Sequence, residues 1–308
     1  MTSIPMFDAA FTAHRATIFG LCYRMTGSAA DADDLVQATF ERLLEKPPSD
    51  LDAPLRPWLC TVATRLSIDA LRKRRRESYF GPWLPGPVET SVLAEDVSLS
   101  PEARYGALES ATLAFLLALE VLDERQRAVL VLRDVFGMSG PEVAGVLETS
   151  PGNVRVLLHR ARAALAKEDP VRPVTKEARE ETSKLMQALL FALSSGDTKT
   201  AMGLLATDSV SMNDGGGEYI AAVVPVRGPE AIARLYRNIQ QAGGAPSGFG
   251  AGDHNGMPTI WITYQRSSRY APRALLSADV RDGQVHRLYV VLHPRKLAGV
   301  QFGADAPA

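Results

Sequence analysis

The sequence predicts two all-α domains followed by an α+β domain. Apolar side chains recur at helical spacing in residues 1–77 and again in 105–168, whereas residues 174–295 hold runs typical of strands. Proline-rich stretches separate these segments, and proline ends helices because it removes a donor and clashes with the preceding turn. At 308 residues the chain also exceeds what one hydrophobic core usually organises. We therefore expect helical domains at 1–77 and 105–168, a linker at 78–104, the α+β domain at 174–295 and a tail at 296–308.

The composition is that of a soluble globular protein, with 46% hydrophobic and 22% charged residues. Near-neutrality, at a net charge of -1, does not argue against nucleic-acid binding, because basic residues cluster locally. Alone the cluster is weak evidence, since charge at a helix end also complements the helix dipole. It consists of five consecutive residues, Arg72, Lys73, Arg74, Arg75 and Arg76.

Cysteine usage and hydropathy exclude several classes of protein. Cys22 and Cys60 lie far apart, and neither has a His or Cys neighbour at metal spacing. We expect two buried thiols, with no disulfide, no metal site and no cofactor. The longest apolar run, Ala111 to Leu122, is too short to span a bilayer and is interrupted by Glu120, which predicts a cytoplasmic protein without membrane contact.

The first domain reads as helices with one polar face. Ser28 can cap a helix together with Asp31, and a second helix begins near Pro57 and continues into the basic run. In the first of these helices the apolar positions are Ala32, Leu35, Val36, Phe40, Leu43 and Leu44, while Asp33, Asp34, Gln37, Glu41 and Glu45 fall on the other face.

The middle domain carries a helix-turn-helix pattern. Helices are expected at 107–119 and 123–135, the latter stopping at Gly137. Ser139 and Glu142 then form a capping box, and after a very short turn Ser150 caps a helix that begins at Pro151. Two capped helices joined so closely are typical of helix-turn-helix.

The last helix of this domain has an apolar side and a polar, basic side, which is typical of a helix that binds in the major groove of DNA. Val154, Leu157, Leu158 and Ala161 share one side. In the major groove, arginine pairs with guanine edges and asparagine with adenine. The alternative is an ordinary solvated helix, but the short turn and both caps favour DNA. The outward side chains are Asn153, Arg155, Val156, His159, Arg160 and Arg162.

The third domain combines a long helix with strands. The helix covers about Thr175 to Ser194, and a shorter one lies near Pro229 to Gln241. Asp282-Gly283 is a strong tight-hairpin signal, because both central positions of a type I′ turn need positive φ. We expect a curled antiparallel sheet formed by strands 210–213, 219–226, 259–265, 274–280 and 285–292.

Three ordered motifs resemble the extracytoplasmic-function sigma factors of bacterial RNA polymerase. GSAADADDLVQATFERLLE, residues 27–45, looks like the segment that grips the polymerase clamp. RPWLCTVATRLSIDALRKRRR, 56–76, looks like the element that melts and reads the -10 promoter segment. LDERQRAVLVLRDVFGMSGPEVAGVLETSPGNVRVLLHRARAAL, 122–165, is similar to the domain that reads the -35 element.

The resemblance implies partners and roles. The partners would be core RNA polymerase, through its clamp and flap regions, and promoter DNA. Clamp binding would fall to Asp33, Asp34, Gln37 and Phe40, although Phe40 also belongs to the helix core. The DNA strand of the -10 element would lie along Arg65 and the basic run from Arg72 to Arg76. The -35 contacts would come from the outward side chains of the helix that begins at Pro151.

The linker resembles that of a sigma subgroup fused to a SnoaL-like domain. The matching residues are YFGPWLPGP at 79–87 and the NDGGGE stretch at 213–218, which departs from the family pattern at Gly86 and Glu218. A tryptophan between prolines is held in one orientation and buries its ring against a neighbouring surface, and glycines allow another segment to approach the backbone closely. We favour docking of the linker over an ordinary glycine-rich bulge. The residues involved would be Trp83, Leu84, Pro85, Asp214, Gly215, Gly216, Gly217 and Glu218.

The C-terminal domain resembles the SnoaL-like branch of the cone-shaped NTF2-like fold, which often encloses an apolar pocket. No motif identifies a catalytic acid or base, and Asp253-His254 is interpreted as a polar loop. Whether the pocket holds a small ligand stays open. An enzyme of cyclase or isomerase type with a DNA-binding appendage, and a ligand-sensing repressor, are the alternatives. Candidate pocket residues are Tyr219, His254, Trp261, Tyr264, His286 and Tyr289.

Overall fold

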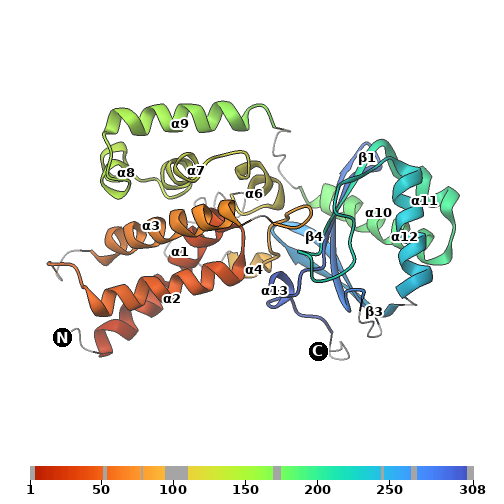
Figure 1. The fold of residues 1–308 in the computed structure, drawn as a ribbon, viewed down its shortest axis with the longest axis horizontal. Helices are drawn as coiled ribbons and strands as arrows, with labels where there is room; N and C mark the ends of the chain where they lie inside the picture. Colours follow the sequence, from red (N-terminus) through yellow and green to blue (C-terminus); the bar gives the residue numbers. More distant parts are fainter. Residues whose placement is uncertain are drawn as a thin grey trace. The chain divides into compact units, whose positions relative to one another are not determined.

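The computed structural model divides into two compact units. Unit 1 comprises Met1–Ser78 with Ser91–Arg172, and unit 2 comprises Tyr79–Thr90 with Pro173–Ala308. The first unit is helical and the second is α+β, which confirms the predicted fold class (Figure 1). The part of the expected linker from Tyr79 to Thr90 therefore belongs to the C-terminal unit. The structure describes residues 4–50, 54–77, 79–93, 110–168, 175–243, 246–264 and 269–303.

The N-terminal part of unit 1 is a packed set of three helices, α1 (Ile4–Thr26), α2 (Ala29–Glu45) and α3 (Leu55–Arg76) (Figure 1). As predicted, Ser28 caps α2, and its hydroxyl accepts a hydrogen bond from the Asp31 amide at 3.2 Å. Both cysteines are buried and free, and burial raises the pKa of the Cys22 thiol to about 12.

One side of α2 enters the core and the other faces solvent. Phe40 is only 1% exposed, and its ring centroid lies 4.9 Å from that of Phe11. Leu44 was expected on the buried side, but it is 48% exposed. The reason is that Leu43, which is fully buried, takes the inward position, and the next residue lies about 100° further round the helix.

The second part of unit 1 contains α6 (Leu113–Leu119), α7 (Glu124–Leu130), α8 (Gly140–Val146) and α9 (Pro151–Leu165). The expected helix at 123–135 continues from α7 into a π-helical turn, η1 (Val131–Val135). The capping box at Ser139 and the Ser150 cap are both confirmed. The expected start at residue 107 lies outside the described residues.

In unit 2 the described strands form one sheet in the order β2-β1-β6-β5-β4-β3. β1 and β6 run parallel, so the expectation of a wholly antiparallel sheet is wrong at this pair. No hairpin joins β1 and β6, so the connection between them does not require the two strands to run antiparallel. The strands are β1 (Leu205–Asp214), β2 (Val226–Arg227), β3 (Pro246–His254), β4 (Met257–Tyr264), β5 (Arg273–Arg281) and β6 (Gln284–Val291).

The helices of unit 2 cover one face of the sheet. Leu189 of α10, Ile232 of α12 and Leu276 of β5 belong to one buried apolar cluster. Figure 1 shows the larger helices on the same side of the strands. These helices are α10 (Lys176–Ser195), α11 (Thr198–Leu204) and α12 (Pro229–Gly243). The short helix α13 (Pro294–Leu297) also belongs to unit 2. Another short helix, α4 (Thr90–Leu93), begins at the last linker residue of unit 2 and continues into unit 1.

Two strand expectations need correction. The segment 219–226 was expected as a strand, but only Val226 at its end joins the sheet. β3 was missed because proline and alternating glycines depress strand propensity. Gly250 is required there, since a Cβ at this position would lie 2.3 Å from the Trp261 ring. The turn at Asn255-Gly256, with φ of 54° and 70°, was the available signal for the β3–β4 hairpin.

No helix in the described ranges combines the length and the apolar character needed to cross a membrane.

The burial of Phe40 leads to a stability prediction. Phe40→Ala should destabilise α2 by about 3–5 kcal/mol, because it empties an aromatic core position. Leu44→Ala, on the solvent side of the same helix, should change stability by less than about 0.5 kcal/mol. Hydrogen exchange of α2 amides in the full chain measures both. Equal effects would show that Phe40 is not a core residue.

Candidate functional site

The basic end of α3 is paired with acidic groups of the following helices. Arg74 Nη2 lies 2.7 Å from Glu120 Oε2, and Arg72 Nε lies 3.1 Å from Glu124 Oε1. Arg75 also reaches Glu124, at 3.3 Å, and donates to the Leu122 carbonyl at 2.6 Å. Three of the residues predicted to lie along the -10 DNA strand therefore contact the part of unit 1 predicted to read the -35 element.

Arg65 makes the same kind of contact further along α3. Its Nε donates to the Val146 carbonyl at 3.0 Å, and its Nη1 lies 3.0 Å from Glu148. By contrast, Lys73 pairs with Glu77, the residue that follows α3, at 3.9 Å, and Arg76 is exposed. Arg65, Arg72 and Arg75 also remain exposed while they make these contacts, whereas Arg74 is half-buried.

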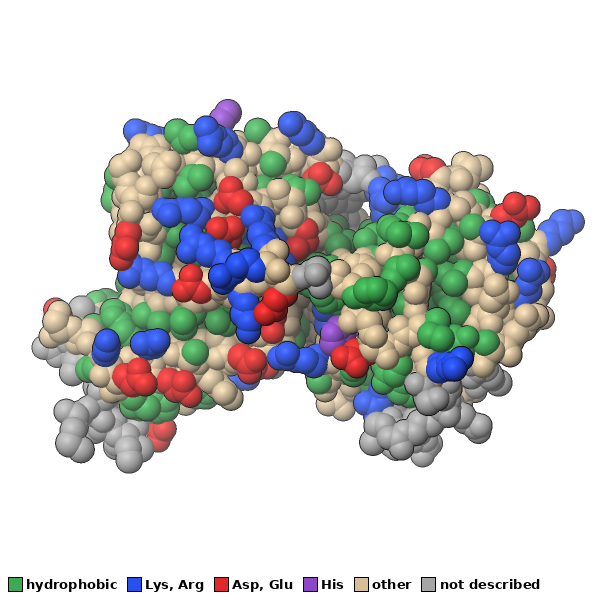
Figure 2. Space-filling view, viewed as in Figure 1, with side chains coloured by type: hydrophobic (Ala, Val, Ile, Leu, Met, Phe, Trp, Pro, Cys, Tyr) green, Lys and Arg blue, Asp and Glu red, His purple; other side chains and the backbone are tan. Residues whose placement is uncertain are grey.

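Glu124 is the shared acidic partner. Partial burial works to raise the pKa of its carboxyl group, but a backbone hydrogen bond and the adjacent Arg72 and Arg75 bring it below the usual value. The carboxylate is therefore charged at neutral pH and holds both arginines. Figure 2 shows Lys and Arg side chains interleaved with Asp and Glu over this face of unit 1.

Arg127 was not anticipated, although it is the most deeply buried cation of this contact. It is 2% exposed and donates to the Met25 carbonyl at 2.8 Å, to the Leu119 carbonyl at 2.7 Å and to Glu120 at 2.7 Å. Burial lowers the pKa of its guanidinium. An arginine just before the apolar run 128–132 was the sequence signal.

α9 presents its predicted outer face to solvent. Val154 and Ala161 are buried, and Asn153, Arg155, Val156, His159 and Arg160 are exposed. Arg162 is also on the surface and forms a two-point contact with Asp134, at 2.7 and 3.1 Å. The outer edge formed by α9 carries basic side chains in Figure 2.

A buried carboxylate anchors the linker in unit 2. Asp214 is fully buried at the end of β1, where it accepts hydrogen bonds from the Tyr79 hydroxyl and, at 2.7 Å, from the Leu84 amide. Lys296 Nζ lies 2.6 Å from the same carboxylate and donates to the Leu84 carbonyl at 2.6 Å. Both polar groups of the Leu84 backbone are therefore satisfied where its side chain is fully buried.

Lys296 is the cation of this anchor. Its ammonium lies 4.8 Å from the Tyr79 ring centroid and 4.4 Å from that of Trp83, distances typical of cation–π contacts. Lys296 and Leu297 are buried, so the packed part of this unit extends past residue 295. Glu218, where the family pattern has lysine, is exposed, so the cation reaches Asp214 from a different part of the chain.

The glycine triplet lies against Phe80 and His293. Gly216 has φ of 58°, and a Cβ there would meet the His293 ring at 2.1 Å, so only glycine fits. The Phe80 side chain lies 3.5 Å from the position of a Cβ on Gly217. The ring of Trp83, for which we expected docking, lies 4.4 Å from the Lys296 ammonium. The His293 ring also stacks on Tyr79, and burial lowers its pKa.

A second anchor holds the other end of the linker segment. The Asn255 amide donates to the Val88 carbonyl at 2.9 Å, and the Asn255 side chain accepts from the Val88 amide at 3.2 Å. Thr90 donates to Asp253 at 2.7 Å. His254 is buried beside them, 2.7 Å from Thr259 Oγ1, and burial lowers its pKa. The expected polar loop at 253–254 is therefore the end of β3 and part of this anchor.

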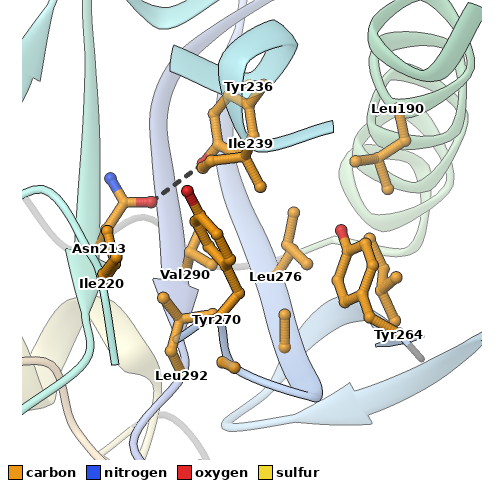
Figure 3. Close-up of a pocket in the computed structure, with 13 residues that line it drawn as sticks. Leu190, Asn213, Ile220, Tyr236, Ile239, Tyr264, Tyr270, Leu276, Val290 and Leu292 are labelled. Carbon is orange, nitrogen blue, oxygen red and sulfur yellow. Dashed lines mark hydrogen bonds between the residues drawn. The ribbon is translucent and has the colours of Figure 1, made fainter. Parts of the chain in front are cut away.

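A pocket opens between the sheet and the helices of unit 2 (Figure 3). Of the six candidate aromatic residues, Tyr264 lines it. Trp261 instead packs against Phe302, and His286 lies 3.1 Å from Asp208. The side chains around the pocket are Leu190, Asn213, Ile220, Tyr236, Ile239, Ile262, Tyr264, Tyr270, Ala271, Ala274, Leu276, Val290 and Leu292.

Two family models match unit 1. The Sigma-70 region 2 model matches residues 10–77, and the Sigma-70 region 4 model matches residues 112–165. The helices α1–α3 and α6–α9 are therefore the two regions that define sigma factors, in the order expected from the motifs. The protein is a sigma factor.

Similarity over the full length of the chain identifies the family within the sigma factors. It is 34% identical over 297 residues to the ECF RNA polymerase sigma factor SigJ of Mycobacterium tuberculosis, covering 94% of this chain and 92% of SigJ. The crystal structure of SigJ matches with a TM-score of 0.69 and 30% identity, over 95% of this chain and 98% of that one. A probable ECF sigma factor of the same organism, SigI, is 32% identical over 204 residues, which cover 64% of this chain and 66% of SigI. The protein belongs to the extracytoplasmic function (ECF) RNA polymerase sigma factors.

The linker anchor gives the second prediction. Lys296→Met should destabilise the ends of β1 and β6 by about 3–5 kcal/mol, because it leaves the Asp214 carboxylate buried without a cation. The double variant Asp214→Asn with Lys296→Met should recover much of that loss. Hydrogen exchange in the full chain reports both. Additive losses in the double variant would mean that the two groups do not act as a pair.

Proposed function

We propose that this chain binds core RNA polymerase through α2 and directs it to promoters that α9 reads at the -35 element. The observation that carries the proposal is the succession of region 2 and region 4, the latter ending in a capped helix with an exposed basic face. The domain limits expected above, 1–77 and 105–168, correspond to these two functions.

For the clamp, the support comes from the solvent side of α2. Asp33, Asp34 and Gln37 are exposed there, and Asp33 pairs with Arg15 at 3.2 Å. Phe40 is buried, and we assign it to positioning α2 rather than to contact with polymerase. The flap is the proposed partner of region 4.

Promoter binding requires the two regions to separate. The -10 and -35 elements are roughly 25 base pairs apart, or about 85 Å at about 3.4 Å per base pair. In this structure region 2 and region 4 touch through Arg65, Arg72, Arg74 and Arg75. We therefore propose that the free chain adopts a closed state, which polymerase opens, and that the released arginines then meet DNA phosphates.

We further propose that the C-terminal domain regulates the sigma domains through the linker and is not an enzyme. Support for regulation is the fixation of residues 79–90 on that domain at both ends. Support for the absence of catalysis is the described pocket lining, which contains no Asp, Glu, His, Lys or Arg, the side chains that most often act as acid or base.

Reconstituted transcription tests the proposal as a whole. The chain is added to core RNA polymerase with a promoter library randomised at the -35 element, and run-off transcripts are sequenced. The proposal predicts transcripts that begin at defined sites and share a -35 motif. Failure to bind core polymerase, or transcripts without a common motif, would contradict it.

Arg155 is predicted to read a base in this assay. Arg155→Ala should weaken promoter binding by about 1 to 3 kcal/mol on templates with the selected motif. It should also relax base selection at one position of the -35 element. Lys167→Ala, beyond the end of α9, is the matched control and should leave the motif unchanged. A uniform loss across all templates would instead assign Arg155 to a phosphate.

Weakening the closed state should expose the -10 arginines. The double variant Glu120→Gln with Glu124→Gln removes the acidic groups that the later helices present to Arg72, Arg74 and Arg75. We expect about three- to tenfold tighter binding of single-stranded -10 DNA by the free chain. Fluorescence anisotropy with a labelled oligonucleotide measures this. Glu168→Gln removes one exposed carboxylate as a control for net charge. An equal gain per charge in the control would contradict the closed state.

A further inference from the structure

The pocket of unit 2 is an apolar space with two adjoining parts. The inner part has a free volume of about 70 Å³ and lies between α12 and strands β1, β4, β5 and β6. The outer part has about 420 Å³ and reaches the surface between α10, α12 and β3. The two parts share the lining residues Leu190, Tyr236, Ile239, Ile262 and Tyr264, so they lie side by side.

Aromatic side chains mark the entrance. Phe191 and Phe249 both line the outer part, and they are 74% and 78% exposed. Single exposed apolar residues are ordinary, but two phenylalanines at the mouth of an apolar pocket extend its surface outward. The space is within the range of pockets that hold small molecules, about 300–1,000 Å³.

Polar groups in the lining are few and uncharged. Asn213 and Tyr236 hydrogen-bond each other at 3.3 Å (Figure 3). Both also contact Ser211 Oγ, at 3.1 and 3.0 Å. The described lining has no charged side chain that could balance an ion in this space. A charged ligand would therefore lose its hydration without compensation.

Tyr264 is a polar group of the lining that can serve a ligand. Within the described parts of the chain its hydroxyl has no hydrogen-bond partner, although its ring lines both parts of the pocket. Burial raises the pKa of the Tyr264 and Tyr236 phenols, so both stay protonated at neutral pH and can donate. In Figure 3 the Tyr264 and Tyr270 hydroxyls end on the side where the helices lie.

We propose that this pocket binds an uncharged, mainly apolar small molecule, and that Tyr264 donates a hydrogen bond to a carbonyl or hydroxyl oxygen of it. The site goes beyond the sigma function, and binding can be measured without polymerase or DNA. A neutral ligand fits the lining because only its one polar atom must exchange a water partner for a protein partner.

Three probes of matched shape test the ligand class. These are 2-acetylnaphthalene, 2-isopropylnaphthalene and 2-naphthoate, which present a ketone, a hydrocarbon and a carboxylate on the same ring system. Isothermal titration calorimetry with the full-length chain should show the ketone binding at least about tenfold tighter than the carboxylate. Equal affinity for these two, or no binding of the ketone up to its solubility limit, would overturn the proposal.

Two variants locate the binding. Tyr264→Phe should weaken ketone binding roughly two- to tenfold and leave hydrocarbon binding unchanged, since only the hydroxyl is lost. Tyr219→Phe, a tyrosine of the same domain outside the pocket lining, should change neither. Ile239→Trp should fill the pocket and abolish binding of all three probes, with circular dichroism confirming the fold. If Tyr264→Phe weakens ketone and hydrocarbon equally, or if Ile239→Trp is folded and still binds, the proposed site is wrong.

Discussion

The buried carboxylate of Asp214 is the constraint on which the C-terminal unit depends. A charge without solvent is costly unless it is paired and hydrogen-bonded, and here Lys296, the Tyr79 hydroxyl and the Leu84 amide supply those partners. Each comes from a segment distant in sequence from β1. When the sheet folds, the linker and the C-terminal helix α13 must therefore pack together at the end of β1. If either stayed in solvent, the Asp214 carboxylate would be buried without some of its partners. The linker thus becomes part of a domain that follows it by more than eighty residues.

The same strand ends also reach the pocket. Successive side chains of a strand point to opposite faces, so Asn213 lines the pocket while Asp214 holds the linker. β6 repeats this arrangement just beyond its end, where Leu292 lines the pocket and His293 stacks on Tyr79. Both of these residues donate their backbone amides to the Asp214 carbonyl, at 2.8 and 3.1 Å. Two adjacent dipeptides therefore form the shared wall between the pocket and the linker anchor.

Local signals in the sequence were enough for the helices and their caps. Ser28, Ser139 and Ser150 cap as predicted, because capping depends on residues within one turn. The outer face of α9 and the Asp282-Gly283 turn follow from similarly short patterns. The importance of Asp214 was inferred from a motif, but its cation was not, since Lys296 is 82 residues away. Likewise, no local pattern pairs the α3 arginines with Glu120 and Glu124, and β3 was hidden by its glycines.

Hydrogen exchange at the Leu84 amide tests the linker anchor most directly. This amide lies outside the helices and strands, so only its hydrogen bond to the Asp214 carboxylate can protect it. The account predicts that Leu84 in the full chain exchanges as slowly as the core amides of β1 and β6, and that Asp214→Ala abolishes this protection. Exchange of the wild-type Leu84 amide at the rate of an exposed loop would contradict the account.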